Sequence, residues 1–81
     1  MDFNHQLTDS LFRIGQKLSH IRRTRNEKLT TVAKAVDMSH GIISRIENGR
    51  YDSLSVELLL KLAHYYNVSV YELFAHAQGS A

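Results

Sequence analysis

The sequence predicts an all-α fold, because apolar residues recur with a helical period along the chain and its 81 residues include no proline. The strict alternation of apolar and polar residues that marks strands is missing. With 43% apolar and 22% charged residues, the composition is typical of a single small globular domain. A domain of this size buries only a thin core, which disfavours a deep catalytic cavity.

The first predicted helix covers about residues 8–25, and Asn26 ends it because asparagine tolerates the left-handed conformation after a helix. A second helix of about two turns follows over residues 29–36. In both segments the apolar residues are spaced by three or four positions, which places them on one face. These residues are Leu7, Leu11, Ile14, Leu18 and Ile21 in the first helix and Leu29, Val32, Ala33 and Val36 in the second.

Serines mark the starts of three further helices, because a serine hydroxyl accepts a hydrogen bond from a free N–H of the first turn. Ser39 begins a third helix that reaches about Asn48, and Gly49 supplies the left-handed stop. Ser55 begins a fourth helix that closes at Asn67. Ser69 and Glu72 have the spacing of a capping box and begin a short fifth helix through Phe74.

Seven short motifs follow one another in order over residues 14–74: Ile14-Gly15-Gln16-Lys17-Leu18, Val32-Ala33, Met38-Ser39, Ile43-Ser44-Arg45-Ile46-Glu47-Asn48-Gly49-Arg50, Leu59-Leu60-Lys61-Leu62-Ala63, Asn67-Val68-Ser69 and Glu72-Leu73-Phe74. In this order and spacing they resemble the helix-turn-helix family of Cro and the phage repressors (Xre type). The resemblance implies a compact five-helix, lambda-repressor-like DNA-binding domain, with the helix-turn-helix at helices two and three. The predicted organisation is an extension over residues 1–12 that runs into the first helix, the domain over 13–74 and a flexible tail over 75–81.

Charge supports this reading independently of the resemblance. Residues 13–50 hold nine of the ten Lys and Arg residues against Glu27, Asp37 and Glu47, a formal charge of +6. The rest of the chain carries −4, so the net charge of +2 conceals a strong asymmetry. A cationic surface releases counterions from DNA phosphates and gives affinity without sequence information.

Sequence information has to come from side chains on the outer face of the third helix. The predicted base-reading residues are His40, Gly41, Ser44 and Arg45, which lie outside the apolar stripe of that helix. Arg45 is the main candidate because a guanidinium bonds bidentately to guanine O6 and N7. Gly41 departs from the polar residue often found at its position and offers only its backbone.

Other polar residues are predicted to hold the phosphate backbone. They are Lys17, Arg22, Ser39, Asn48, Arg50, Tyr51 and Ser53. For the last four the resemblance implies this role, because they lie in the loop that the family uses to hold the phosphate backbone. For Ser39 a pure capping role, and for Tyr51 simple packing, stay open as alternatives. Arg22 and Glu47 also match a pair that in the family forms a partly buried salt bridge between helices one and three, and this pair is interpreted as structural.

The entrance to the second helix departs from the family pattern. The family usually has an apolar residue, a Ser or Thr cap and often Gln there, whereas this chain has Glu27, Lys28 and Leu29. The N-cap is therefore weak, and Leu29 cannot make the polar contact that Gln commonly makes. Thr30 or Thr31 is a possible substitute.

The sequence holds no motif for catalysis, metal binding or cofactor binding. The five histidines are too widely spaced for a local metal-ligand motif, no Gly-rich loop cradles a phosphate, and no arrangement indicates a triad. We expect no enzymatic activity, metal or cofactor, and the sequence does not indicate a small-molecule effector. The absence of cysteine points to a reducing cytosolic setting, and no apolar run is long enough for a membrane span.

The resulting hypothesis is a sequence-specific regulator of transcription that binds double-stranded DNA as a homodimer, on half-sites about one helical turn apart. Two candidate dimer surfaces are the fifth helix, through Tyr71 and Phe74, and the extension containing Phe3, Leu7 and Phe12. The alternative for these residues is packing within the chain, which is the favoured interpretation for Leu7 and Leu11. The alternative function is that of a protein-interaction adaptor or antitoxin-like partner that uses the same fold without reading bases.

Overall fold

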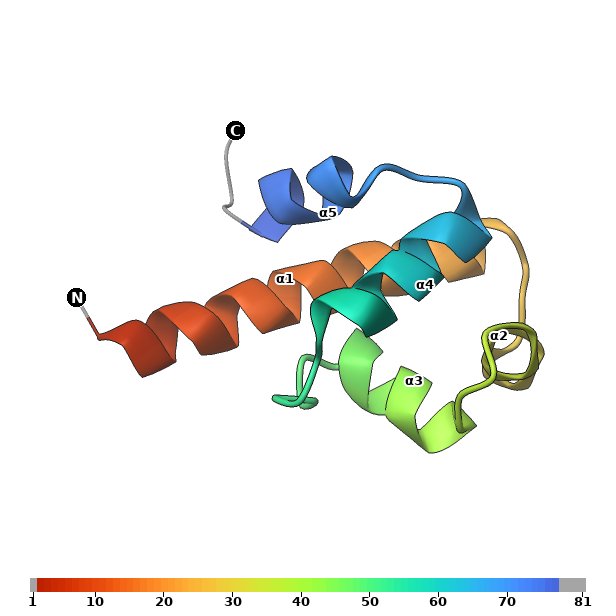
Figure 1. Ribbon diagram of the computed structural model, residues 1–81, viewed down its shortest axis with the longest axis horizontal. Helices are drawn as coiled ribbons and strands as arrows, with labels where there is room; N and C mark the ends of the chain where they lie inside the picture. Colours follow the sequence, from red (N-terminus) through yellow and green to blue (C-terminus); the bar gives the residue numbers. More distant parts are fainter. Residues whose placement is uncertain (1, 78–81) are drawn as a thin grey trace.

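The structure is a computed structural model that describes residues 2–77, with side chains up to residue 75, and five helices account for most of this part (Figure 1). They are α1 (Phe3–Thr24), α2 (Leu29–Ala35), α3 (His40–Glu47), α4 (Val56–Tyr66) and α5 (Val70–Ala77). Residues 2–77 contain no strand. The predicted all-α, five-helix fold is confirmed.

All five helices contribute to one apolar core. The long helix α1 packs against α3 on one side and α5 on the other, while α2 packs mainly against α3 (Figure 1). The core residues follow the predicted helical period, and five of them are almost fully buried: Leu18, Val32, Ile43, Leu62 and Leu73. Within residues 2–77, no helix has both the length and the apolar character that crossing a bilayer requires.

The predicted helix ends depend on local chemistry that the structure reproduces. Ser39 Oγ accepts a hydrogen bond from the N–H of Ile42 at 3.2 Å, and Ser55 Oγ does the same for Leu58. Asn67 closes α4 with a φ of 56°. Ser69 caps α5 through the N–H of Tyr71 rather than that of Glu72, so the capping-box geometry is not the one predicted.

Two helix boundaries differ from the prediction. Helix α1 begins at Phe3 and not near residue 8, because Asp2 is itself a good N-cap and accepts from Asn4 N at 3.1 Å. The extension over residues 1–12 is therefore continuous with α1 from Phe3 onward. Helix α5 continues to Ala77, where a frayed tail was expected from residue 75, because alanine is the best helix former. The remainder of that tail, residues 78–81, lies outside the described residues.

Candidate nucleic-acid interface

Helices α2 and α3 form a compact pair joined by a short turn. The turn reverses at Asp37, which takes a left-handed φ of 57°, and Ser39 then begins α3. Val32 and Ala33 of α2 are buried in the same core as the inner face of α3. Two short helices joined in this way are the helix-turn-helix arrangement, in which the second helix is presented to the outside.

The outer face of α3 carries the residues predicted to read bases. Ile43 and Ile46 point into the core, whereas His40, Gly41 and Arg45 are exposed and Ser44 is half-buried. Around Gly41 the surface is open, since a Cβ there would have only Ser39 Oγ nearby, at 3.9 Å. The Arg45 guanidinium and the His40 ring are therefore accessible, as contact with base edges requires.

The loop after α3 is held by the end of that helix. Asn48 Nδ2 donates to the carbonyl of Ser44 at 2.8 Å, and the N–H of Arg50 donates to the carbonyl of Arg45 at 2.8 Å. Gly49 has a φ of 70°, and a Cβ there would lie 2.6 Å from Phe12 Cα, so both its conformation and its close contact with α1 require glycine.

The remaining predicted phosphate-binding residues are distributed around this loop and α1. Asn48, Arg50 and Ser53 are exposed, and Tyr51 is half-buried with its side chain packed against the core. Lys17 is half-buried on α1, close to the side chains of Gln16, His20 and Arg23. The packing of Tyr51 leaves both of its proposed roles compatible with the structure.

Arg22 and Glu47 link α1 to the end of α3. Arg22 Nε donates to Glu47 Oε2 at 2.8 Å and Nη2 donates to Oε1 at 3.0 Å, with 15% and 8% of the two side chains exposed. Arg22 Nη1 also donates to the carbonyl of Glu27 at 2.8 Å. The hydrogen bond to Glu47 is the main cause that raises the pKa of Arg22. Because its nitrogens are engaged inside the protein, we assign Arg22 a structural role and remove it from the phosphate-binding set.

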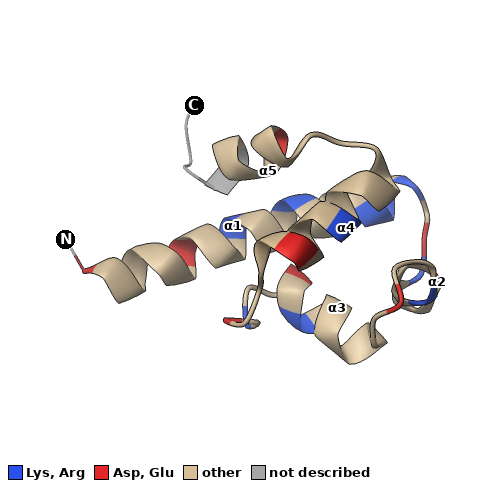
Figure 2. Ribbon diagram, viewed as in Figure 1, with Lys and Arg blue, Asp and Glu red and all other residues tan. Residues whose placement is uncertain are grey.

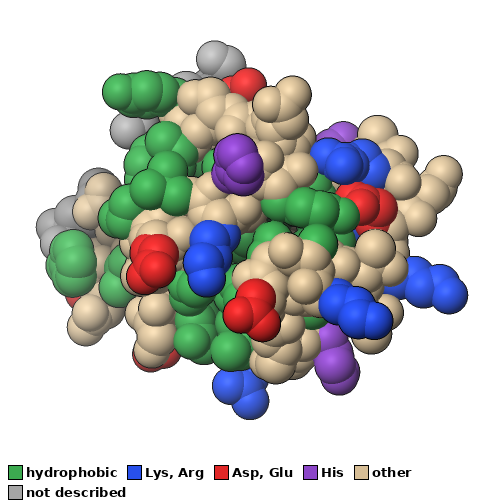
Figure 3. All heavy atoms as spheres, turned by 45° about the vertical axis from the view of Figure 1, so that its right-hand side comes forward, with side chains coloured by type: hydrophobic (Ala, Val, Ile, Leu, Met, Phe, Trp, Pro, Cys, Tyr) green, Lys and Arg blue, Asp and Glu red, His purple; other side chains and the backbone are tan. Residues whose placement is uncertain are grey.

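Six of the nine Lys and Arg residues in the basic region, residues 13–50, have no carboxylate within 4.0 Å among the described residues. Arg13 pairs with Asp9, Arg22 with Glu47 and Arg25 with Glu27. The six others are Lys17, Arg23, Lys28, Lys34, Arg45 and Arg50. Figure 2 shows Lys and Arg on the second half of α1, on α2 and around the end of α3, and Figure 3 shows such side chains projecting from the face that carries α2. This surface is suited to a polyanion.

Sequence reasoning missed how closely the helices approach one another. Gly15 belongs to the motif that carries the family resemblance, yet its packing role was not predicted. In the structure it is buried where α1 crosses the end of α3. The available signal was a glycine in the middle of a strong helical pattern, where it is costly without a packing reason.

Comparisons with known proteins agree with this geometry. The helix-turn-helix family profile matches residues 21–73. A crystal structure of the clp gene regulator ClgR from Corynebacterium glutamicum is 30% identical, with a TM-score of 0.77 over 86% of this chain and 90% of that chain. The restriction-modification controller protein C.AhdI from Aeromonas hydrophila is 26% identical, with a TM-score of 0.73 over 79% of this chain and 96% of that one. A search of curated proteins found no match.

The fold, the exposed second helix and the basic surface define a helix-turn-helix domain. With more than half of its length matched, the chain belongs to the helix-turn-helix family of the Cro and phage-repressor type, as the sequence predicted. It is a DNA-binding regulator of transcription.

Proposed function

We propose that this regulator binds double-stranded DNA sequence-specifically in the cytoplasm, with α3 in the major groove and no catalytic step. The observation that carries the proposal is the exposed Arg45 on α3, within a segment, residues 13–50, whose cations Lys17, Arg23, Lys28, Lys34 and Arg50 also have no acidic partner among the described residues. Arg45 reads guanine through two hydrogen bonds, while His40 and Ser44 offer further polar contacts. Gly41 contributes close backbone approach only.

Affinity comes from a second set of contacts, to phosphates. This set consists of Lys17, Ser39, Asn48, Arg50, Tyr51 and Ser53. The exposure of Arg50 and Ser53, next to the end of α3, supports their part in it. Ser39 keeps its capping bond to the N–H of Ile42 and offers the hydroxyl proton to a phosphate.

Selection from a randomised duplex pool tests sequence readout. The wild-type chain should enrich a defined sequence. Arg45→Ala should then relax the preference at one base position by about 1 to 3 kcal/mol. Lys17→Ala should instead lower the affinity for all sequences alike, and the slope of the logarithm of the binding constant against that of the salt concentration should fall by about one. If the wild-type chain enriches no sequence at any salt concentration, the adaptor function is favoured instead.

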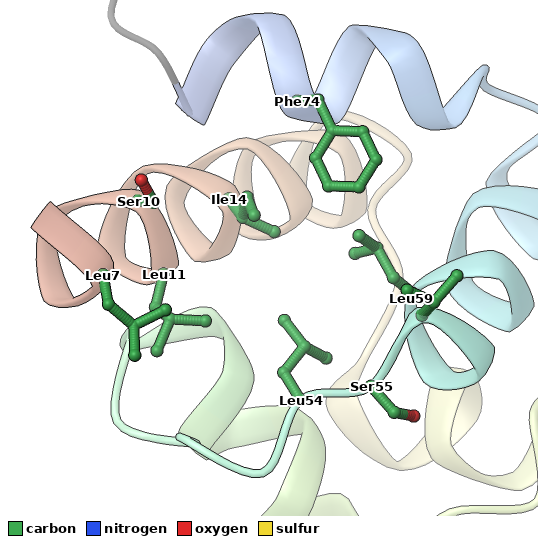
Figure 4. Close-up of a pocket in the computed structure, with 9 residues that line it drawn as sticks. Leu7, Ser10, Leu11, Ile14, Leu54, Ser55, Leu59 and Phe74 are labelled. Carbon is green, nitrogen blue, oxygen red and sulfur yellow. The ribbon is translucent and has the colours of Figure 1, made fainter. Parts of the chain in front are cut away.

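The proposal includes a homodimer, and an apolar groove supports it. The groove has a volume of about 380 Å³ and lies between the first half of α1, the start of α4 and α5 (Figure 4). Leu7 from the extension and Phe74 from α5 both line it, so one residue of each suggested dimer surface faces the same groove, whereas Tyr71 and Phe3 lie outside its lining. Leu7, Phe74 and Val56 are 39%, 42% and 65% exposed. Phe12 instead lies against Gly49.

Sedimentation equilibrium tests the dimer. Phe74→Ser should weaken self-association because it places a polar group in the groove, and it should lower the affinity for a two-half-site duplex more than for a single half-site. Tyr71→Ser is the matched control, since Tyr71 is 80% exposed and outside the groove lining. A wild-type chain that stays monomeric with and without DNA would exclude this part of the proposal.

A further inference from the structure

Glu27 lies in a cluster that connects the end of α1, the start of α2 and the end of α4. Its carboxylate accepts a hydrogen bond from the Tyr65 hydroxyl through Oε2, and Arg25 Nε lies 3.0 Å from Oε1. The second contact is an ion pair without a hydrogen bond, because Oε1 accepts none among the described residues. Only 17% of the Glu27 side chain is exposed. A buried carboxylate is retained at low cost only when partners of this kind hold it.

The cluster continues into the last turn of α4. The Arg25 guanidinium carbon lies 5.4 Å from the ring centroids of both Tyr65 and Tyr66, and Arg25 Nη1 donates to the Tyr66 carbonyl at 3.3 Å. Arg22 Nη1 holds the Glu27 carbonyl at the same time. Both the side chain and the backbone of Glu27 are therefore fixed to elements outside α2.

Helix α2 needs such a connection. Lys28 stands at its N-cap position and makes no side-chain capping bond, so the first turn lacks the usual local anchor. Among the helices of residues 2–77, α2 packs extensively against α3 alone, and Figure 1 shows α2 apart from α1 and α4. A shift at the start of α2 is thus transmitted chiefly to the helix that carries Arg45.

We propose that Glu27 is a positioning residue for DNA recognition: held by Tyr65 and Arg25, it anchors the chain at the start of α2, where a side-chain N-cap is missing, and through α2 it fixes the recognition helix α3. The proposal rests on the DNA-binding function proposed above. It also explains why this chain has Glu27 where the family usually has an apolar residue. An apolar side chain at position 27 could neither accept a hydrogen bond from the Tyr65 hydroxyl nor pair with the Arg25 guanidinium.

Two variants separate positioning from stability. Glu27→Leu replaces the buried carboxylate with an apolar group; the Arg25 side chain left behind is 42% exposed and stays hydrated, so the unfolding midpoint is expected to fall only slightly. Tyr65→Phe removes one hydroxyl without a change in net charge. We expect both to lower the affinity for the duplex selected by the wild-type chain by about 2- to 30-fold, the range typical of residues that act without touching the ligand. Glu27→Gln keeps an oxygen acceptor for Tyr65 and should recover part of the loss. Glu72→Leu and Tyr71→Phe, at exposed positions of α5, are the matched controls.

Amide hydrogen exchange supplies a readout that does not depend on DNA. In Glu27→Leu and Tyr65→Phe, the hydrogen-bonded amides of α2, which begin with the Val32 N–H bonded to the Lys28 carbonyl, should exchange faster than in the wild-type chain, while those of α4 stay protected. Wild-type exchange rates at residues 32–35 in both variants would overturn the proposal, as would an affinity loss no larger than the loss of folded protein. A wild-type chain that selects no duplex would refute the proposed function, and the exchange rates would still decide whether Glu27 positions α2.

Discussion

Gly15 of α1 lies directly against the backbone of Ile46 in α3: a Cβ built on Gly15 would be 2.2 Å from the Ile46 carbonyl oxygen and 2.7 Å from that of Glu47. The two helices therefore meet backbone to backbone at the end of the recognition helix. This contact places the Arg22–Glu47 pair two turns further along α1 within hydrogen-bonding distance.

Gly15→Ala should consequently destabilise the domain, although alanine is the better helix former. The new methyl group meets backbone atoms that cannot rotate away, so α1 has to shift from α3, at an expected loss of about 1 to 3 kcal/mol. The free energy of unfolding from urea titration measures the effect. A variant as stable as the wild-type chain would mean that the two helices are not in close contact in solution.

Gly41→Ala is the corresponding change at an open position of α3. Nothing lies closer than Ser39 Oγ at 3.9 Å, so the gain in helix propensity, up to about 1 kcal/mol, meets no opposing contact. We expect a higher unfolding midpoint in the same urea titration. A loss of stability would show that the glycine has a backbone role in the free protein.

The Arg22–Glu47 pair gives a third prediction. Arg22→Met leaves the Glu47 carboxylate buried without its partner and should cost about 3 to 5 kcal/mol. The double variant Arg22→Met with Glu47→Met should recover most of this loss, apart from the hydrogen bond to the Glu27 carbonyl, worth about 1 kcal/mol. Thermal or urea unfolding of Arg22→Met, of Glu47→Met and of the double variant measures the three losses. A double variant as unstable as the sum of the two single ones would argue that the residues act separately.

The helices and their order could be predicted because the signals are local. Ser39 and Ser55 lie within three residues of the N–H groups they cap, and the apolar stripes repeat within each helix. The start of α1 was placed too late because the apolar stripe becomes visible only from Leu7, whereas the capping residue is Asp2.

Long-range contacts could be predicted only where the family supplied them. Arg22 and Glu47 are 25 residues apart, and only the resemblance pairs them; the exposed face of Arg45, in contrast, follows from the local apolar stripe of α3. Glu27 and Tyr65 are 38 residues apart, and no sequence period connects them. The sequence shows that Glu27 differs from the apolar residue usual in the family. The physical reason becomes visible only in the structure, where α4 brings Tyr65 to its carboxylate.

Alkaline pH should weaken the fold through Tyr65 and Tyr66. The hydrogen bond to Glu27 is the main cause that raises the pKa of Tyr65, and burial is the main cause that raises the pKa of Tyr66. Both shifts favour the protonated phenol in the folded chain over the unfolded chain, whose tyrosines titrate near pH 10. The contribution to stability is complete below about pH 10 and is lost as the pH rises toward the folded-state pKa values.

Urea unfolding of the wild-type chain and of Tyr66→Phe, over a series from about pH 8 to about pH 11, tests this expectation. The Tyr66 hydroxyl has no hydrogen-bond partner among the described residues, so Tyr66→Phe should be at least as stable as the wild-type chain at neutral pH. Above pH 10 it should lose stability less steeply, because it lacks a phenol that stays protonated in the folded chain and ionises only on unfolding. Identical slopes for the two proteins would show that Tyr66 does not resist ionisation in the folded state, while a loss at neutral pH would reveal a partner for its hydroxyl.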